Sequence, residues 1–154
     1  FYVRVNDYIV KVTGTSFNVT SYTDDPCAMT TLVEGKVSVY GNDSTWNCDL
    51  TPGYMLKFDK GTAQVISEEC DPRIYTSWID GEFKFRDMRL ENIMKKLNRW
   101  YDFEVAYEEE ELKDLRFSGA VEKYNPVEFL LKMIEEVTKV RFDIEGKRIM
   151  VKNN

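Results

Sequence analysis

The chain has 154 residues, of which 43% are hydrophobic and 31% are charged, a balance typical of folded globular proteins. Its net charge of −6 leaves no basic excess to neutralise phosphates, so nucleic acid is not an expected partner. The absence of histidine excludes Ser-His triads, imidazole metal sites and the usual near-neutral general base. No apolar run reaches the length of about 18 residues typical of a membrane-spanning helix, so no direct membrane insertion is predicted.

Cysteine usage gives little support to a metal or redox site. Cys27, Cys48 and Cys70 are far apart and form no CxxC motif, which disfavours a zinc site or a thioredoxin-like centre. An odd number of cysteines allows at most one internal disulfide, and the sequence does not choose the pair. The chain starts at Phe1 in strand-like sequence without a signal peptide, which indicates an excised or processed piece of a longer protein.

The N-terminal half follows the pattern of short β-strands separated by turns, and no helical period precedes residue 74. Glu34-Gly35 joins two alternating runs, which predicts a hairpin with glycine at a positive φ angle. Thr51-Pro52-Gly53 fits a type II turn, because proline fixes φ and glycine takes the left-handed position. We therefore predict an all-β sandwich or roll for residues 1–77.

Residues 78–107 are predicted to contain a hinge, a strand, an amphipathic helix and a second strand. The hinge is Trp78–Gly81, and Asp87 is expected to cap the helix by accepting from a free backbone N–H. One apolar face of the helix carries Leu90, Ile93, Met94, Leu97, Trp100 and Tyr101. The flanking strands present Phe83, Phe85, Phe103, Val105 and Tyr107 at period two.

The same pattern returns in the last third of the chain at an offset of 37 residues, so that Leu90 matches Val127 and Tyr107 matches Ile144. The glycine within residues 116–121 predicts a bulge or close packing, and Asn125-Pro126 predicts a helix start with asparagine as cap. We therefore predict that residues 78–154 form a small α+β module of two βαβ units and a final hairpin. Right-handed crossovers would place both helices on one face of a small sheet.

No catalytic, metal or cofactor site is predicted. The candidate carboxylates Asp80, Glu82 and Asp87 are scattered, and no nucleophile stands beside a base. The acidic run Glu108–Glu111 lacks the spaced ligands and the glycine-containing loop of a calcium site, so a solvated linker is the favoured interpretation.

Partner binding is the remaining function. The cluster Arg99-Trp100-Tyr101 is one candidate for an exposed anchor. The alternative, which we favour, is that Trp100 and Tyr101 continue the core face of the helix. Edge strands are better candidates, because their backbone groups are free to pair. If the last strand is an edge with Ile149 and Val151 facing inward, its outward candidate partner-binding residues are Arg148, Met150 and Lys152.

Several motifs in combination resemble one known family. They are VTGTSFNVTSY at 12–22, TTLVEGKVSVY at 30–40, LTPGYMLKF at 50–58, and Trp78, Gly81 and Phe83 followed by RLENIMKKLNRWYDFEVAY, with RFSGAV and Asn125-Pro126 further on. Together they resemble the FecR-type anti-sigma regulators of Bacteroidetes over nearly the whole chain. The three cysteines are not part of that pattern.

The resemblance implies a non-enzymatic periplasmic sensor that is part of a single-pass inner-membrane protein. In that family an N-terminal segment, absent from this chain, binds an extracytoplasmic-function sigma factor. The periplasmic part receives a signal from a TonB-dependent outer-membrane transducer, in what is called cell-surface signalling. By resemblance, residues 1–77 are a FecR-like β domain, and residues 78–154 resemble the short N-terminal domain of secretins and TonB-dependent transporters.

A second function stays open at this point. The alternative interpretation is a carbohydrate- or ligand-binding β module with an appended small domain. The inducer class, such as a glycan or an iron chelate, is not indicated by any residue.

Overall fold

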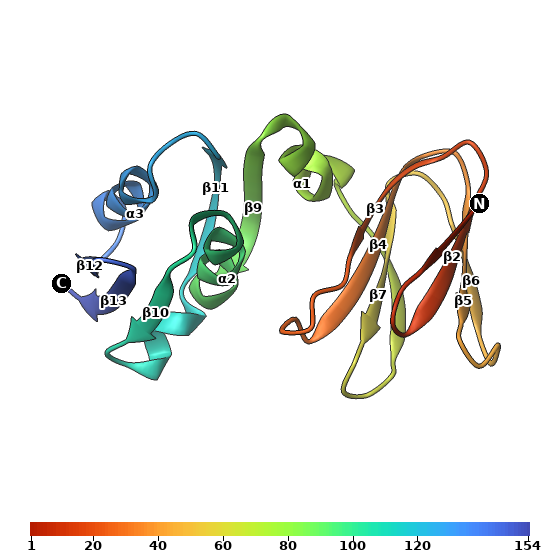
Figure 1. The fold of residues 1–154 in the computed structure, drawn as a ribbon, viewed down its shortest axis with the longest axis horizontal. Coiled ribbons are helices and arrows are strands. Elements are labelled where there is room, and N and C mark those ends of the chain that lie inside the picture. Colours follow the sequence, from red (N-terminus) through yellow and green to blue (C-terminus); the bar gives the residue numbers. More distant parts are fainter. The chain divides into compact units, whose positions relative to one another are not determined.

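A computed structural model describes all residues from Phe1 to Asn154 and divides them into two compact units (Figure 1). Unit 1 is Phe1–Thr76 and unit 2 is Ser77–Asn154. The chain is rich in strands, and its helices longer than one or two turns lie in unit 2. The predicted fold class, β-rich with a small α+β part, is confirmed at that level.

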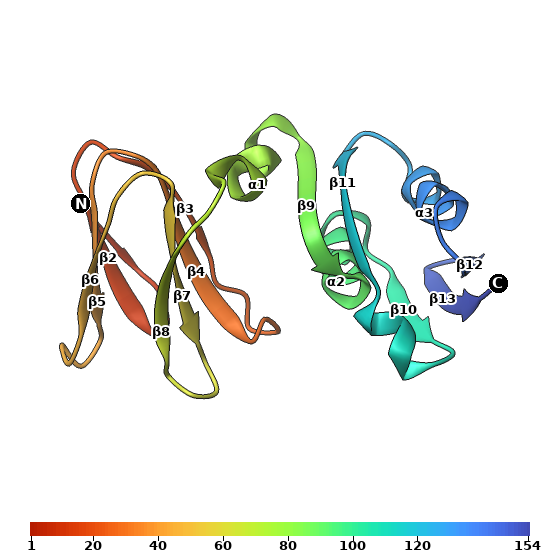
Figure 2. The same cartoon turned by 180° about the vertical axis from the view of Figure 1, so that it is seen from behind.

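Unit 1 consists of eight strands and one short helix. They are β1 (Tyr2–Arg4), β2 (Tyr8–Val12), β3 (Ser16–Thr20), β4 (Cys27–Glu34), β5 (Val37–Gly41), β6 (Asn47–Leu50), β7 (Tyr54–Asp59), β8 (Val65–Glu69) and α1 (Pro72–Thr76). The strands form two antiparallel sheets, ordered β1-β2-β5-β6 and β3-β4-β7-β8, which stand as two layers in Figures 1 and 2. Alternating side chains from both sheets fill one core, including Tyr8, Val10, Leu32, Val39, Leu56 and Phe58.

The two predicted turns of unit 1 differ in outcome. At Thr51–Gly53 the N–H of Tyr54 donates to the carbonyl of Thr51 at 3.1 Å and Gly53 has φ +85, which confirms the type II turn. Gly35 has φ +90, but the strands on either side of it do not pair with each other. The hairpin prediction is wrong, because this glycine carries the chain from one sheet to the other. A Cβ at Gly35 would lie 2.9 Å from the carbonyl oxygen of Gly14, so close packing also requires glycine there.

Unit 2 contains two helices and five strands, with two 3₁₀ turns. They are η1 (Ser77–Asp80), β9 (Glu82–Arg89), α2 (Leu90–Tyr101), β10 (Glu104–Tyr107), η2 (Glu110–Asp114), β11 (Arg116–Glu122), α3 (Val127–Glu136), β12 (Val140–Glu145) and β13 (Arg148–Asn153). Helices α2 and α3 begin 37 residues apart, at the offset seen in the sequence. Both helices and all five strands contribute to one core.

The strands of unit 2 pair differently from the prediction. β9 is antiparallel to β11 in a two-stranded sheet, while β10 runs parallel and β12 antiparallel to the central strand β13 (Figure 2). The two strands of each predicted βαβ unit thus belong to different sheets, and the single-sheet prediction is wrong. The apolar period specifies which face of a strand is buried, but it does not specify which strand lies beside it.

Both predicted helix caps also differ from the prediction. Asp87 lies within β9 with φ +45, and its carboxylate accepts from the guanidinium of Arg116 at 3.0 Å, so it does not cap α2. The local pattern predicted that this carboxylate binds the first N–H groups of the helix, but in the structure it pairs with Arg116, which lies 29 residues further along the chain. At α3 the N-cap is Pro126, one residue later than predicted, and no side chain accepts from the first helical N–H groups.

Candidate partner-binding site

The candidate carboxylates are each held separately. Glu82 pairs with Lys84 at 2.7 Å and Asp87 pairs with Arg116, while Asp80 is exposed. The structure contains no group of three or more Cys, Asp and Glu side chains arranged to hold a metal ion. Cys27, Cys48 and Cys70 are all free thiols. The structure therefore does not bring the candidate carboxylates together.

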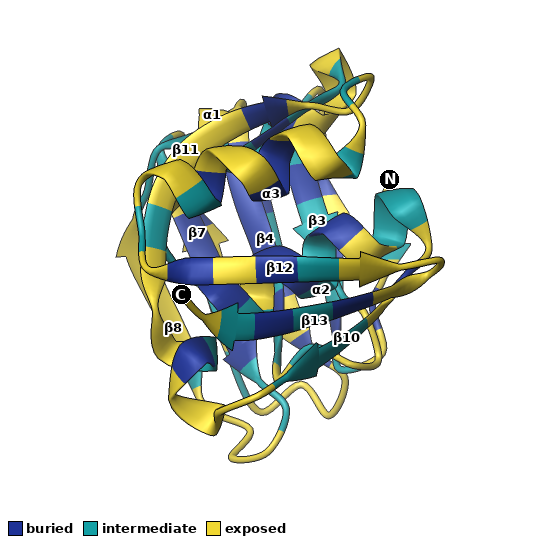
Figure 3. Ribbon diagram, turned by 90° about the vertical axis from the view of Figure 1, so that its left-hand side faces the viewer, coloured by how far each residue is buried: buried dark blue, intermediate teal, exposed yellow.

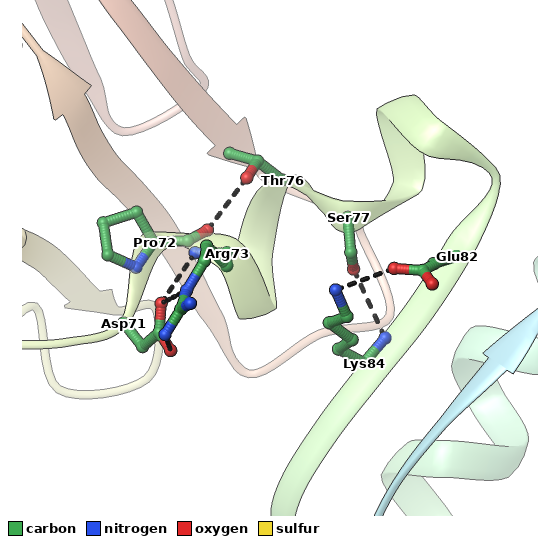
Figure 4. A network of polar contacts seen from close by, with 7 residues as sticks. All are labelled: Asp71, Pro72, Arg73, Thr76, Ser77, Glu82 and Lys84. Carbon is green, nitrogen blue, oxygen red and sulfur yellow. Dashed lines mark hydrogen bonds and ion pairs between the residues drawn. The ribbon is translucent and has the colours of Figure 1, made fainter.

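The chain passes from unit 1 to unit 2 at Thr76-Ser77, and each side is fixed by bonds within its own unit (Figure 4). On the unit 1 side, Arg73 donates twice to the carboxylate of Asp71, at 2.9 and 2.8 Å, and this contact raises the pKa of Arg73. On the unit 2 side, the N–H of Lys84 donates to Ser77 Oγ at 3.3 Å. The predicted hinge Trp78–Gly81 follows directly. Gly81 has φ +73, but movement at this corner stays a prediction.

The predicted partner-binding residues lie on a strand that is not an edge. β13 is the central strand of its sheet, with β10 on one side and β12 on the other, so its backbone cannot receive another strand. The inward orientation of Ile149 and Val151 is confirmed, since both are buried. Along the same strand, Arg148 is exposed and Met150 and Lys152 are half-buried.

The outer face of this sheet carries mixed charge. Lys152 Nζ lies 2.7 Å from the carboxylate of Asp143 on β12, and this bond lowers the pKa of Asp143. Met150 stands between Asp143 on one neighbouring strand and Ala106 on the other. Arg148, Met150 and Lys152 are therefore brought to one open sheet face, and their role in binding stays a prediction.

Two strand edges of unit 2 are closed by side chains of the unit itself. On β12 the N–H of Phe142 donates to Glu135 Oε1 at 2.6 Å, and the N–H of Val140 donates to Thr138 Oγ1 at 3.2 Å. On β9 the Ser77 hydroxyl accepts from Lys84, as described above. Such bonds occupy the groups that a second strand would need.

The β11 edge is open by comparison. β11 pairs with β9 alone, and its residues Ser118–Ala120 are exposed. In an antiparallel pair of strands, hydrogen-bonded and non-hydrogen-bonded residue pairs alternate. The N–H of Lys123 donates to the carbonyl of Gly81, so these two residues form a hydrogen-bonded pair. Ala120, three residues before Lys123, therefore belongs to a non-hydrogen-bonded pair, and its N–H and C=O point away from β9 to the open side. The short side chains of this segment allow another backbone to approach closely.

Helix α3 has an apolar outer face, which the sequence interpretation missed. Phe129, Met133 and Val137 are 53%, 45% and 77% exposed, and Tyr124 just before the helix is 87% exposed. Figure 3 shows the exposed residues of α3 beside β12 and β13. The helical period predicts a core face of Val127, Leu130, Leu131, Ile134 and Val137, and this prediction is wrong for Val137. The signal for the outer face was available, because Phe129 and Met133 are apolar residues outside that predicted core face.

The aromatic end of α2 belongs to the core of unit 2, as favoured from the sequence. Trp100 is half-buried, packs against that core and lies edge-on to Phe83. The hydroxyl of Tyr101 donates to the carbonyl of Asn125 at 2.7 Å. These side chains are structural and are not an exposed anchor.

Comparisons with known proteins agree with this description. Residues 82–151 match the family model described as FecR, C-terminal. The whole chain is similar to two crystal structures of a candidate anti-sigma factor from Parabacteroides distasonis ATCC 8503, with TM-scores of 0.86 and 0.85. In both comparisons the identity is 25%, and the match covers 100% of this chain and 71% of the other. No curated protein sequence matches the chain.

The fold and these matches support a regulatory role of the anti-sigma factor kind. Most of unit 2 matches the FecR C-terminal model, and the resemblance of the chain to FecR-type anti-sigma factors is confirmed. That family is regulatory and not typically enzymatic. None of the helices in the structure has the length and apolar character needed to cross a membrane.

Proposed function

We propose that this chain is the periplasmic, signal-receiving part of a FecR-type anti-sigma factor anchored in the inner membrane by a single span. It relays a signal from a TonB-dependent outer-membrane transducer to an extracytoplasmic-function sigma factor, which is bound by a segment outside this chain. The observation that carries the proposal is the match of residues 82–151 to the FecR C-terminal model. The likeness of the whole chain to a candidate anti-sigma factor supports it.

The proposal assigns a role to each part. Residues 1–77 serve as a FecR-like β domain, and residues 78–154 serve as the module that resembles the short N-terminal domain of secretins and TonB-dependent transporters. The division of the chain into two compact units supports this organisation. The exposed glycine-containing corner Trp78–Gly81 serves as the hinge between them.

Within unit 2 we assign the contact with the transducer's signalling domain to the open edge of β11, through addition of a strand. Strand addition uses main-chain hydrogen bonds and needs an edge without bulky or charged obstruction, which Ser118–Ala120 provides. The outer face with Arg148, Met150 and Lys152 is the second assigned surface. It contributes charge to a partner face, but no backbone pairing.

The contact is tested by isothermal titration of the full chain with the purified signalling domain of the cognate transducer. Ala120→Pro removes an edge N–H without removing a ladder bond to β9, and it is expected to weaken binding at least tenfold. A triple variant, Arg148→Ala with Met150→Ala and Lys152→Ala, tests the sheet face. Thermal unfolding of each variant verifies the fold. Binding by unit 1 that is unaffected by all these changes would contradict the assignment.

The alternative function, direct binding of a carbohydrate or another small ligand by the β unit, is separated by titration with candidate glycans. Binding of a free sugar to the chain in the absence of any transducer would favour that alternative.

A further inference from the structure

The outer face of α3 carries a stripe of apolar side chains that the core of unit 2 does not use. We define the α3 stripe as Phe129 and Met133 of the helix together with its C-cap residue Val137; the three recur at every fourth residue and so lie on one side of the helix. We propose that two copies of this chain associate through the α3 stripe, with the two helices antiparallel about a two-fold axis at Met133.

The internal repeat supplies a comparison for this surface. At the offset of 37 residues, α2 carries Asn92 and Lys96 where α3 carries Phe129 and Met133. Trp100, which corresponds to Val137, packs against the core, whereas Val137 is exposed. The two helices share three buried positions but differ in their outer faces, so the fold of the repeat does not require the α3 stripe. Contiguous exposed apolar side chains of this kind mark interaction surfaces.

The charges beside the stripe favour a second copy as the occupant. Lys132 and Glu136 are exposed and lie along the solvent side of the stripe, one turn apart. In an antiparallel pair centred on Met133, Phe129 lies opposite Val137 of the second copy. The same arrangement brings Lys132 near Glu136 of the second copy, and the two-fold axis repeats that ion pair. A partner surface of uniform charge would instead repel either Lys132 or Glu136.

The size of the patch predicts a weak complex. α3 has ten residues and is therefore about 15 Å long, and a single helix face buries less than the roughly 800 Å² per partner of a standard interface. The dimer is expected to form reversibly at micromolar or higher concentration. Antiparallel helices also place opposite dipole ends side by side, which favours this orientation over a parallel one.

Sedimentation equilibrium of the full chain over a range of concentrations tests the proposal. The wild-type chain is expected to show a monomer–dimer equilibrium. Met133→Lys places two like charges at the axis and is expected to raise the dimer dissociation constant at least tenfold. Asn92→Lys, on the corresponding face of α2, is the matched control and is expected to leave it unchanged. A chain that stays monomeric throughout the concentration range overturns the proposal.

A charge exchange separates this arrangement from nonspecific association. Lys132→Glu is expected to weaken the dimer, and adding Glu136→Lys is expected to restore it, because the reversed pair is again complementary. Failure of the double variant to recover affinity overturns the antiparallel register. Loss of transducer binding in Met133→Lys, in a chain that is monomeric throughout, would assign the stripe to a different partner and overturn the proposal.

Discussion

Gly119 lies directly against the aromatic ring of Phe85, so that a Cβ built at Gly119 would be 3.0 Å from Phe85 Cζ. The register of β11 on β9 shifts between Phe117 and Gly119, and the bulge falls at this contact. Phe85 is itself buried in the core of unit 2. The Phe85 ring and the lack of a side chain at Gly119 together therefore determine the register of β11 on β9.

Replacing Gly119 should destabilise unit 2. Gly119→Val forces the Phe85 ring or the strand to move, which is expected to lower the free energy of unfolding by about 1–3 kcal/mol. Urea denaturation measures the change. Ala120→Val, one residue along on the exposed side of β11, is the matched control and is expected to change stability by less than about 0.5 kcal/mol. Equal effects of the two substitutions would show that the ring contact is not the constraint.

A similar contact in unit 1 involves Trp46. A Cβ at Gly41 would lie 2.5 Å from Trp46 Nε1, and the Trp46 ring stacks on Phe58 at a centroid distance of 6.2 Å. Gly41→Ala is expected to displace the indole, reduce the near-ultraviolet circular dichroism and cost about 1–3 kcal/mol of stability. Gly61→Ala, where the nearest atom is at an ordinary 3.5 Å, should leave both measurements near wild type.

Closure of the β12 edge by Glu135 can be tested directly. Glu135→Ala leaves the N–H of Phe142 without its acceptor, and because that group is half-enclosed we expect a loss of about 1–2 kcal/mol of unfolding free energy. Glu135→Gln keeps an acceptor oxygen and should retain most of the stability. Light scattering provides a second readout, since an opened edge favours aggregation. Equal stability of the Ala and Gln variants would contradict the bond's role.

Tyr8 should make the stability of unit 1 sensitive to alkaline pH. Burial raises the pKa of Tyr8 to about 12, and its hydroxyl forms a hydrogen bond of 3.0 Å with Thr30 Oγ1. The unfolded chain releases this proton near pH 10, so the contribution is complete below pH 10 and is lost as the pH rises towards 12. Unfolding measurements from pH 8 to 11 should show a steeper decline in wild type than in Tyr8→Phe.

The same substitution has a cost at neutral pH. Tyr8→Phe leaves the buried hydroxyl of Thr30 without its partner, which is expected to lower stability by about 1–2 kcal/mol. Tyr8→Phe is therefore expected to have a lower free energy of unfolding than wild type at neutral pH, and to lose less of it as the pH rises. Parallel pH profiles for the two proteins would contradict the assignment.

Local features of the fold were predictable from the sequence, because a few neighbouring residues determine them. The turn at Thr51–Gly53 and the tight packing at Gly119 both follow from the restricted choices of proline and glycine. The apolar faces of the two helices followed from their period, except that Val137, expected at the end of the core face of α3, is exposed because the helix ends at Glu136. Each of these depends on residues that are close together in the chain.

Strand order was not predictable in the same way. The pattern that identified Ile149 and Val151 as buried says nothing about the neighbours of β13, so its central position was missed. The partner of Asp87 is Arg116, far along the chain, and the local pattern therefore suggested a helix cap. The candidate binding surfaces could not be predicted from the sequence for the same reason. Whether a strand edge is open or closed depends on side chains from other elements, such as Glu135 on α3, which binds the N–H of Phe142 on β12.

The exchange of strands between the halves of unit 2 constrains the order in which it folds during synthesis. β9 acquires a neighbour when β11 is made, but β10 and β12 both depend on β13, the last strand of the chain. Until residues 148–153 leave the ribosome, the three-stranded sheet has no centre and the core side chains of both helices lack one wall. Unit 1, whose sheets close within its own residues, completes its strand pairing first. Unit 2 therefore completes its strand pairing only after β13 has been made.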